Sequence, residues 1–317
     1  EVPYIQNPKD GILVTANNKI AGKEYQYHLS LDYAPEYRYR RIYDRLELIN
    51  NSRVEDMQDI HAERMSIPAA TLIPLLLKVV PLDKQSKRAM EHLKSWDFSM
   101  ESDAVAPTVY SAFRLKLTEK LIRHLVGSPA EDLLGAEAFL SGNMHQLEAA
   151  FVAKANGDDT SLLPQGKSWM ELMAEALKEG VGMLTSRFGE EMESWTWGRV
   201  HYTRPRHTLS EAFPEISALI DPQPVAVGGD GDTPQAASFS REDLFVLTST
   251  SVARYVFDTN DWEKSVWIVP LGASGHPGSP HYSDQTQFWQ NVDCIPMTYD
   301  WNKIRKQAVS TQRLDQG

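Results

Sequence analysis

The sequence predicts an α+β chain with a helical lobe followed by a β-rich segment. Through the middle of its 317 residues, apolar side chains recur every three or four positions, the period of an amphipathic helix. From Trp195 onward the pattern changes to runs rich in Val, Tyr, Phe and Trp, which favour strands, and to a tight polar turn at Gly228-Gly229-Asp230-Gly231-Asp232. We therefore expect three segments: residues 1–53, which lead from a strand into the first helix, the helical lobe 54–194, and the β-rich segment 195–317.

The first segment is expected to open with a short buried strand. Residues 12–15 form an apolar run, and Asn17-Asn18 end it with a polar turn. A Tyr-rich loop follows over residues 25–37. Helical spacing, with Pro, Gly or Asp at the joins, then predicts helices over 38–49, 54–65, 68–80, 84–96, 104–126, 130–140, 144–156 and 169–188.

The β-rich segment is expected to form a sheet. Its candidate strands are residues 244–251, 253–258 and 265–271. The last stretch, 289–317, is mixed, and we expect its polar end after Lys306 to be frayed.

Composition excludes several classes of protein. The formal net charge of -11 and a single dense basic cluster at residues 37–41 argue against nucleic-acid binding, which needs a cationic surface. No run of about 18 apolar residues is present, so no membrane span is expected. Cys294 is the only cysteine, which rules out an intramolecular disulfide and a cysteine-rich metal site.

Three motifs suggest chemistry but fit it poorly. The turn at 228–232 lacks the alternating oxygen ligands and closing Glu of an EF-hand, so we expect a structural turn. Ser274 lacks the complete Gly-x-Ser-x-Gly of a nucleophile elbow. His276 and His281 could chelate zinc with a third ligand, but hydrogen bonds that order their loop are the favoured interpretation.

Two motifs at opposite ends of the chain carry a family resemblance. They read Gly11-Ile-Leu-Val-Thr-Ala-Asn17-Asn18-Lys-Ile-Ala-Gly and Gly272-Ala-Ser-Gly-His276-Pro-Gly-Ser-Pro-His281-Tyr-Ser-Asp284-Gln285, and together they resemble the late part of a penicillin acylase β-subunit. The resemblance implies the αββα sandwich of an N-terminal-nucleophile hydrolase, incomplete in this chain. Further matching elements are Tyr37-Arg38, Arg41-Ile42, Met57-Gln58-Asp59, Ser95-Trp96-Asp97 and residues 229–233.

The resemblance also implies roles for three residues. Asn17 matches the Asn whose side-chain amide helps form the oxyanion hole, where such a donor contributes roughly 3 kcal/mol. Arg38 matches an Arg near the active site, where its guanidinium would orient the catalytic Asn or the N-terminal amine; a helix-surface charge is the alternative. Asp32 lies where relatives place a carboxylate that binds a structural calcium, although one carboxylate cannot hold the ion without ligands from upstream segments.

The family mechanism uses an N-terminal Ser and its own α-amine, whereas this sequence starts at Glu1. We therefore expect a C-terminal portion of an autoproteolytically processed β-subunit, inactive by itself, whose partners are the missing N-terminal part of that subunit and the α-subunit. Its substrate would be a small N-acylated amine such as a β-lactam side-chain amide or an acyl-homoserine lactone. Catalysis would need no cofactor, and the parent protein is expected to be periplasmic or secreted, with the cytoplasm as an alternative.

Two other interpretations stay open. The chain could be a non-catalytic binding or scaffold module of the same fold. It could also belong to a serine hydrolase that uses Ser274 with His276 or His281.

Overall fold

The structure is a computed structural model that describes residues 2–134, 141–239, 243 and 245–315. Its internal contacts divide the chain into two compact units, each built from separate stretches of sequence. The first unit comprises Glu1–Leu48, Glu63–Arg204 and Gln223–Thr250, and the second comprises Ile49–Ala62, Pro205–Pro222 and Ser251–Gly317.

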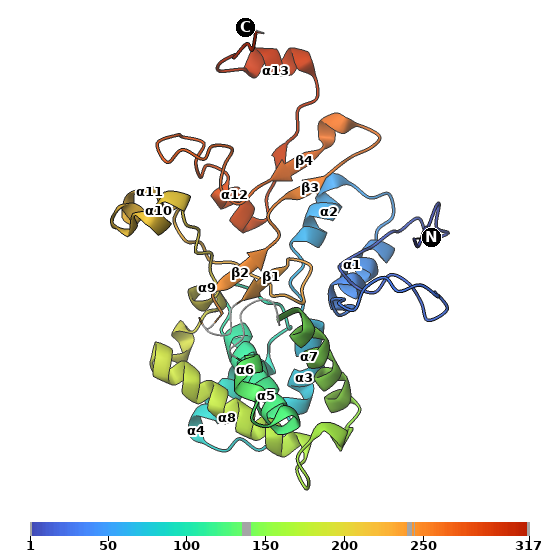
Figure 1. Ribbon diagram of the computed structural model, residues 1–317, viewed down its shortest axis with the longest axis vertical. Coiled ribbons are helices and arrows are strands. Elements are labelled where there is room, and N and C mark those ends of the chain that lie inside the picture. Colours follow the sequence, from blue (N-terminus) through green and yellow to red (C-terminus); the bar gives the residue numbers. More distant parts are fainter. Residues whose placement is uncertain (1, 135–140, 240–242, 244, 316–317) are drawn as a thin grey trace. The chain divides into compact units, whose positions relative to one another are not determined.

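The first unit is a helical body with a small two-stranded sheet (Figure 1). Strands β1 (Ala237–Phe239) and β2 (Leu247–Thr250) pair antiparallel, with Ala237 opposite Thr250. Its helices are α1 (Tyr37–Glu47), α3 (Ile67–Leu76), α4 (Lys84–Lys94), α5 (Ala106–Val126), α6 (Ala130–Leu134), α7 (Ser141–Asn156), α8 (Trp169–Phe188) and the short α9 (Trp197–Val200).

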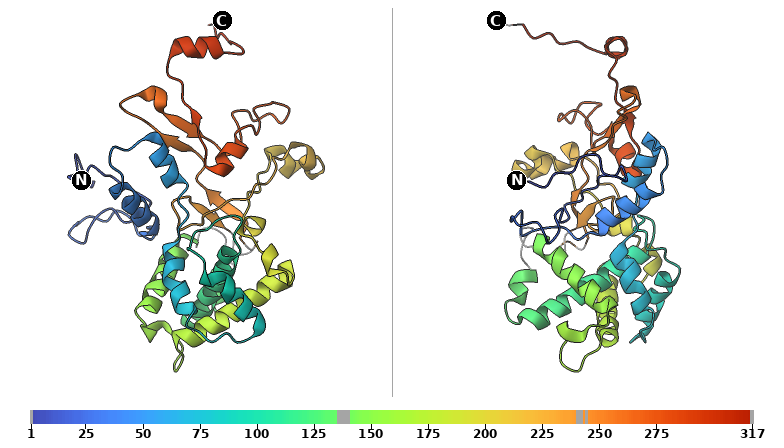
Figure 2. Two further views of the ribbon diagram at one scale, coloured as in Figure 1. Left: turned by 180° about the vertical axis from the view of Figure 1, so that it is seen from behind. Right: turned by 90° about the vertical axis from the view of Figure 1, so that its right-hand side faces the viewer.

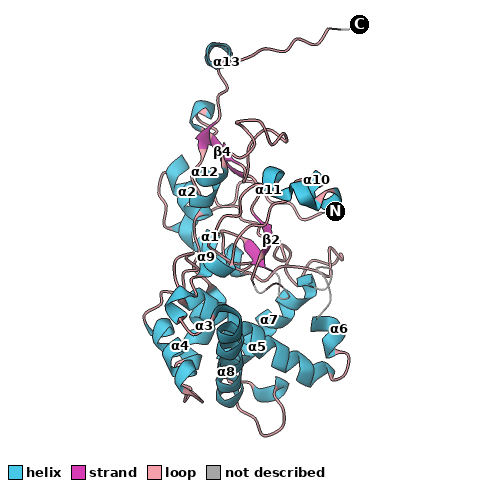
Figure 3. Ribbon diagram, turned by 90° about the vertical axis from the view of Figure 1, so that its left-hand side faces the viewer, coloured by secondary structure: helices cyan, strands magenta, loops and turns pink. Residues whose placement is uncertain are grey.

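The two longest helices, α5 and α8, form the centre of this unit and lie side by side (Figure 3). Phe113, Leu121, Leu177 and Leu184 bury their side chains almost completely in the core to which both helices contribute. Helix α8 begins with a capping box, in which the Ser168 hydroxyl accepts from the Glu171 backbone N–H at 3.3 Å and the Glu171 carboxylate accepts from the Ser168 N–H at 2.9 Å.

The second unit contains a three-stranded antiparallel sheet of order β3-β4-β5 (orange to red in Figure 2). Tyr255 lies opposite Trp267, and their rings stack with centroids 6.5 Å apart. The unit's strands are β3 (Arg254–Val256), β4 (Val266–Ile268) and β5 (Ile295–Pro296), and its helices are α2 (Val54–His61), α10 (Thr208–Ala212), α11 (Ser217–Ile220), α12 (Thr286–Asn291) and α13 (Trp301–Gln307).

The observed elements confirm the α+β prediction, and α8 has the predicted bounds. The predicted helix 130–140 is seen as Ala130–Leu134, and residues 135–140 lie outside the described part of the chain. The predicted strands are shorter than expected. None of the helices in the described residues is both long and apolar enough to cross a bilayer.

The prediction of a buried strand at residues 12–15 is wrong. This stretch is assigned to no strand, and Leu13 is 64% exposed. A strand is stabilised by a neighbour that binds its backbone N–H and C=O groups, and no described strand pairs with this stretch.

The close approach of α5 and α8 depends on Gly180. A Cβ atom at this position would lie 2.9 Å from the carbonyl carbon and oxygen of Ala112, which is backbone and cannot move aside. We expect Gly180→Ala to lower the free energy of unfolding by about 1–3 kcal/mol, as overpacked cores do.

Gly182→Ala is the matched control because no atom lies within 4 Å of its added Cβ on the same helix. It should be neutral or stabilise the chain by up to about 1 kcal/mol, since Ala is the better helix former. Chemical denaturation of both variants checks this, and equal effects would contradict the packing argument.

Candidate active site

The first unit contains Asn17 at a bend with left-handed backbone geometry. Its φ is 60°, a conformation that Asn tolerates better than most residues. The neighbouring Asn18 is buried, and its side-chain oxygen accepts from the Ala16 N–H at 3.1 Å. The carbonyl of Asn17 accepts from the Ala34 N–H at 2.8 Å, which closes the loop of residues 18–33 at its neck. Backbone contacts thus fix the bend while the Asn17 side chain stays exposed.

Arg38 orients the Asn17 side chain. It is the second residue of α1, and its Nη2 donates to the Asn17 Oδ1 at 3.0 Å. A guanidinium can only donate hydrogen bonds, so the amide must present its oxygen to Arg38. The Nδ2 group of Asn17 therefore points away from Arg38 and can donate to another acceptor. The structure thus brings together two of the three residues that the resemblance singled out.

The predicted polar turn forms a tightly bonded loop in the same unit. Gly229 has a φ of 80°, and a Cβ there would lie 2.1 Å from the Gln235 carbonyl oxygen. The Thr233 hydroxyl accepts from the Asp230 N–H at 2.9 Å, and the Asp230 carboxylate accepts from the Asp232 N–H at 2.8 Å. Asp230 and Asp232 are both buried, with exposed fractions of 2% and 5%.

Arg114 of α5 connects this loop to α7. Its Nη1 contacts the Asp232 carboxylate at 2.7 Å and its Nη2 contacts the Glu148 carboxylate at 2.8 Å. We call Arg114, Asp232 and Glu148 the buried ion triad. Burial, followed by the charge of Asp232, raises the pKa of Asp230 well above its usual value. Motif reasoning missed the triad, although a lone Arg between Phe113 and Leu115 of a buried helix was a signal for it.

His201 holds the two ends of the loop together. The side chain is fully buried, with Nδ1 2.7 Å from the Val227 carbonyl oxygen and Nε2 3.1 Å from the Ala237 carbonyl oxygen. Its ring stacks on Trp197 at a centroid distance of 4.5 Å. Burial is the largest influence on the His201 imidazole and lowers its pKa to about 4. The hydrogen bonds with the two carbonyl oxygens raise this pKa, but by less. The imidazole is therefore neutral at physiological pH.

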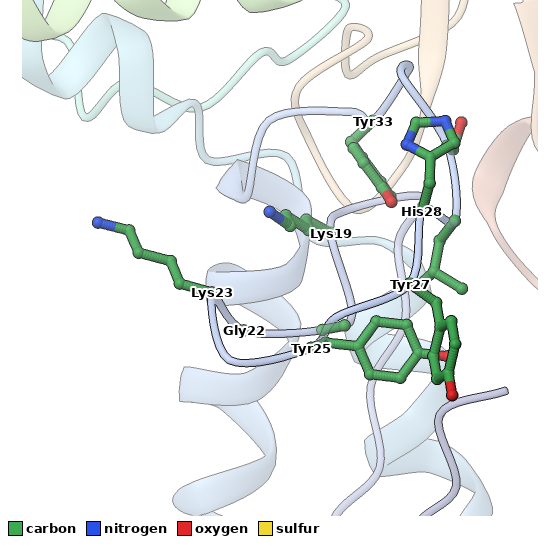
Figure 4. A pocket seen from close by; sticks show the side chains of 10 residues that line it. Lys19, Gly22, Lys23, Tyr25, Tyr27, His28 and Tyr33 are labelled. Carbon is green, nitrogen blue, oxygen red and sulfur yellow. The ribbon is translucent and has the colours of Figure 1, made fainter. Parts of the chain in front are cut away.

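The loop of residues 18–33 encloses a shallow pocket, whose lining is shown in Figure 4. The cavity measures about 130 Å³, and Lys19, His28 and Tyr33 are among the side chains that line it. The rings of Tyr25 and Tyr27, also in the lining, meet edge to face at 5.8 Å. The pocket therefore has an aromatic and partly basic lining.

The third predicted residue, Asp32, lies exposed in that loop, where its backbone N–H donates to the Ser30 hydroxyl at 3.1 Å. Across the described residues, no three His, Cys, Asp or Glu side chains lie close enough together to bind a metal ion. The described residues therefore do not fit a calcium site at Asp32 without further oxygen ligands.

The Ser274 alternative lies in the second unit. The Ser274 hydroxyl accepts from the His276 backbone N–H at 3.2 Å, and the His276 Nδ1 accepts from the Gly278 N–H at 2.9 Å. His281 instead faces Asp284, with 2.8 Å between Nδ1 and the carboxylate. These contacts order the loop, and within the described chain no hydrogen bond links Ser274 to an imidazole.

Comparison with solved structures defines the class of fold. The chain is similar to a thermostable penicillin G acylase from Alcaligenes faecalis, with a TM-score of 0.58 and 20% identity over 98% of this chain and 58% of that one. This likeness shows that the chain shares the fold of that acylase, in which helices are combined with small antiparallel sheets.

The chain belongs to the penicillin amidase family, whose sequence model matches residues 1–306. It is 34% identical over 317 residues to the penicillin acylase 2 proenzyme of Pseudomonas sp. (strain SE83), and this alignment covers 99% of this chain and 40% of that protein. It is 24% identical over 321 residues to the acyl-homoserine lactone acylase QuiP of Pseudomonas aeruginosa, covering 90% of this chain and 37% of that protein. The chain thus spans about two fifths of the length of these relatives.

The low pKa of His201 predicts a pH-dependent stability. The unfolded chain, with a His pKa near 6.5, binds a proton between about pH 6.5 and pH 4 that the folded chain does not bind. The contribution of His201 to the free energy of unfolding is therefore complete above pH 6.5 and falls by about 3 kcal/mol as the pH drops to about 4.

His201→Gln isolates this contribution because the variant retains every other titrating group. Denaturation curves of both proteins between pH 4 and pH 7 should show the wild type losing its advantage over the variant as the pH falls. A stability difference that stays constant across this range would mean that the His201 pKa is unperturbed.

Proposed function

We propose that this chain is the C-terminal part of an acylase that hydrolyses N-acyl amide bonds. The single observation that carries the proposal is the hydrogen bond from Arg38 to the Asn17 Oδ1, because it makes the amide present its oxygen to Arg38 and leaves Nδ2 to donate to a different acceptor. An oxygen that gains negative charge during attack on an amide is such an acceptor. The names of the relatives, a penicillin acylase and an acyl-homoserine lactone acylase, support an N-acylated amine as substrate.

In the proposed mechanism, the hydroxyl of an N-terminal Ser, supplied by another part of the mature protein, attacks the amide carbonyl. Asn17 donates from Nδ2 to the oxyanion, and Arg38 keeps the amide in that orientation. The amine then leaves, and water releases the acid from the acyl-enzyme. In this mechanism the attacking Ser belongs to another part of the protein, so we infer that the isolated chain is inactive.

The proposal implies partners and a compartment. The upstream part of the β-subunit and the α-subunit would complete the active site after processing, and the parent protein would be periplasmic or secreted. A structural calcium in the complete enzyme would need oxygen ligands from those upstream parts in addition to Asp32.

Asn17→Gly in the complete acylase tests the assignment. Glycine tolerates the positive φ at this position, so the substitution removes the amide without adding backbone strain. We expect kcat for an N-acyl substrate to fall about 100- to 1,000-fold, as it does when one oxyanion donor is lost.

Asn51→Gly is the matched control, because Asn51 is exposed and has nearly the same backbone geometry, with a φ of 58°. Its kcat should equal that of the wild type. If Asn17→Gly retained full activity, or if the isolated chain turned over substrate without its partners, the proposed role would be wrong.

A further inference from the structure

Helix α1 carries Arg38 but contributes no residue to the buried core. Its eleven residues, Tyr37–Glu47, all lie in the described part of the chain, and none of them is buried. Most helices in proteins are held in place by the packing of one apolar face. The position of α1, and with it that of the Arg38 guanidinium, therefore depends more than usual on polar contacts.

Glu63 makes two of these contacts. Its Oε2 accepts from the Arg41 Nη2 at 3.0 Å and from the Arg45 Nη1 at 3.2 Å. Arg38, Arg41 and Arg45 are spaced so that all three lie on one face of the helix. Arg41 and Arg45 belong to successive turns, about 6 Å apart along the helix axis. One carboxylate thus constrains both the rotation and the axial position of α1.

The Glu63 carboxylate is itself held in place. The side chain is 8% exposed, and its Oε1 accepts from the Met65 N–H at 3.0 Å. The Glu63 carbonyl oxygen accepts from the Gln235 N–H at 2.9 Å, and two further backbone hydrogen bonds join residues 64–66 to residues 98–100. The anchor of α1 is therefore a short segment whose backbone is bound to two other stretches of the first unit.

The same helix face reaches the candidate site. Arg38 lies one turn before Arg41, and its Nη2 donates to the Asn17 Oδ1 at 3.0 Å. A hydrogen bond of this kind weakens steeply when its distance and angle are disturbed. A shift or rotation of α1 would therefore release the Asn17 amide and let it turn.

We propose that Glu63 is a positioning residue for the reaction: by binding Arg41 and Arg45, it holds α1 where Arg38 directs the Asn17 amide toward the oxyanion. This inference rests on the proposed function of Asn17. Each link from Glu63 to Asn17 is either a hydrogen bond or the backbone of α1.

The chemistry predicts which kinetic constant depends on Glu63. The oxyanion exists in the transition state and not in the bound substrate, so a misdirected Asn17 amide lowers kcat and leaves KM nearly unchanged. Because Glu63 acts through Arg38, its removal should have no further effect once Arg38 no longer binds Asn17.

A double-mutant cycle in the complete acylase tests this proposal. Glu63→Gln removes the charge that both guanidinium groups bind and nearly retains the shape of the side chain. Glu63→Gln and Arg38→Met are each expected to lower kcat roughly 10-fold or more, with KM within about twofold of the wild type, because small displacements at a reacting group are costly. The double variant should be no slower than Arg38→Met alone. If the two losses multiply, or if Glu63→Gln lowers the melting temperature without changing kcat, the proposal is overturned.

Arg41→Met tests the same link from the side of the helix and replaces Glu63→Gln should that variant fail to fold. It removes one of the two contacts to Glu63, so kcat should fall, and the same comparison in the Arg38→Met background applies. Arg40→Met is the matched control on the same helix, because it breaks an exposed ion pair in which the side chains of Arg40 and Glu36 are 62% and 51% exposed. Its kcat should equal that of the wild type, and equal losses in Arg40→Met and Arg41→Met would overturn the proposal.

Asn17→Gly, measured alongside, separates this proposal from the one on which it rests. Full activity of Asn17→Gly would remove both proposals. A large loss in Asn17→Gly combined with an unchanged kcat in Glu63→Gln, or with losses that multiply in the cycle, would remove only the role of Glu63.

Discussion

The buried guanidinium of Arg114 is the constraint on which the first unit depends. A cation inside a helical core is stable only if carboxylates bind it, and Asp232 and Glu148 do so from a loop and a helix that are far apart in sequence. Satisfying this one charge fixes the loop of residues 228–235 against α5 and fixes α7 on its other side. The apolar packing of α5 on α8 then sets where that charge lies.

The candidate site combines a rigid support with an exposed reactive group. Asn17 has a left-handed backbone, a conformation that costs a non-glycine residue roughly 1 kcal/mol, and the contacts of Asn18, Ala34 and Arg38 maintain it. Local strain that surrounding contacts hold in place is common at functional sites. The orientation of the amide, more than the presence of an Asn, is therefore what the surrounding structure determines.

The sequence was most informative where the signal is local. The apolar spacing over residues 169–188 predicted α8 correctly, and the glycines of the polar turn predicted its tight backbone. The prediction of a strand at 12–15 was wrong because strand formation depends on a partner strand that the local pattern does not reveal.

Helices such as α10 and α11, of five and four residues, are too short for a periodic signal. Contacts such as that between Arg114 and Asp232, 118 residues apart, follow only from the three-dimensional fold, and the link between Asn17 and Arg38 was expected from the family resemblance alone.

The most direct test of the account is a crystal structure of the complete acylase with a tetrahedral transition-state analogue, such as a boronic acid, bound to the nucleophile. We predict that Asn17 Nδ2 lies within about 3 Å of the analogue's oxyanion oxygen while Asn17 Oδ1 still accepts from Arg38. An analogue whose oxyanion is bound by other donors, with the Asn17 amide turned away, would contradict the central claim.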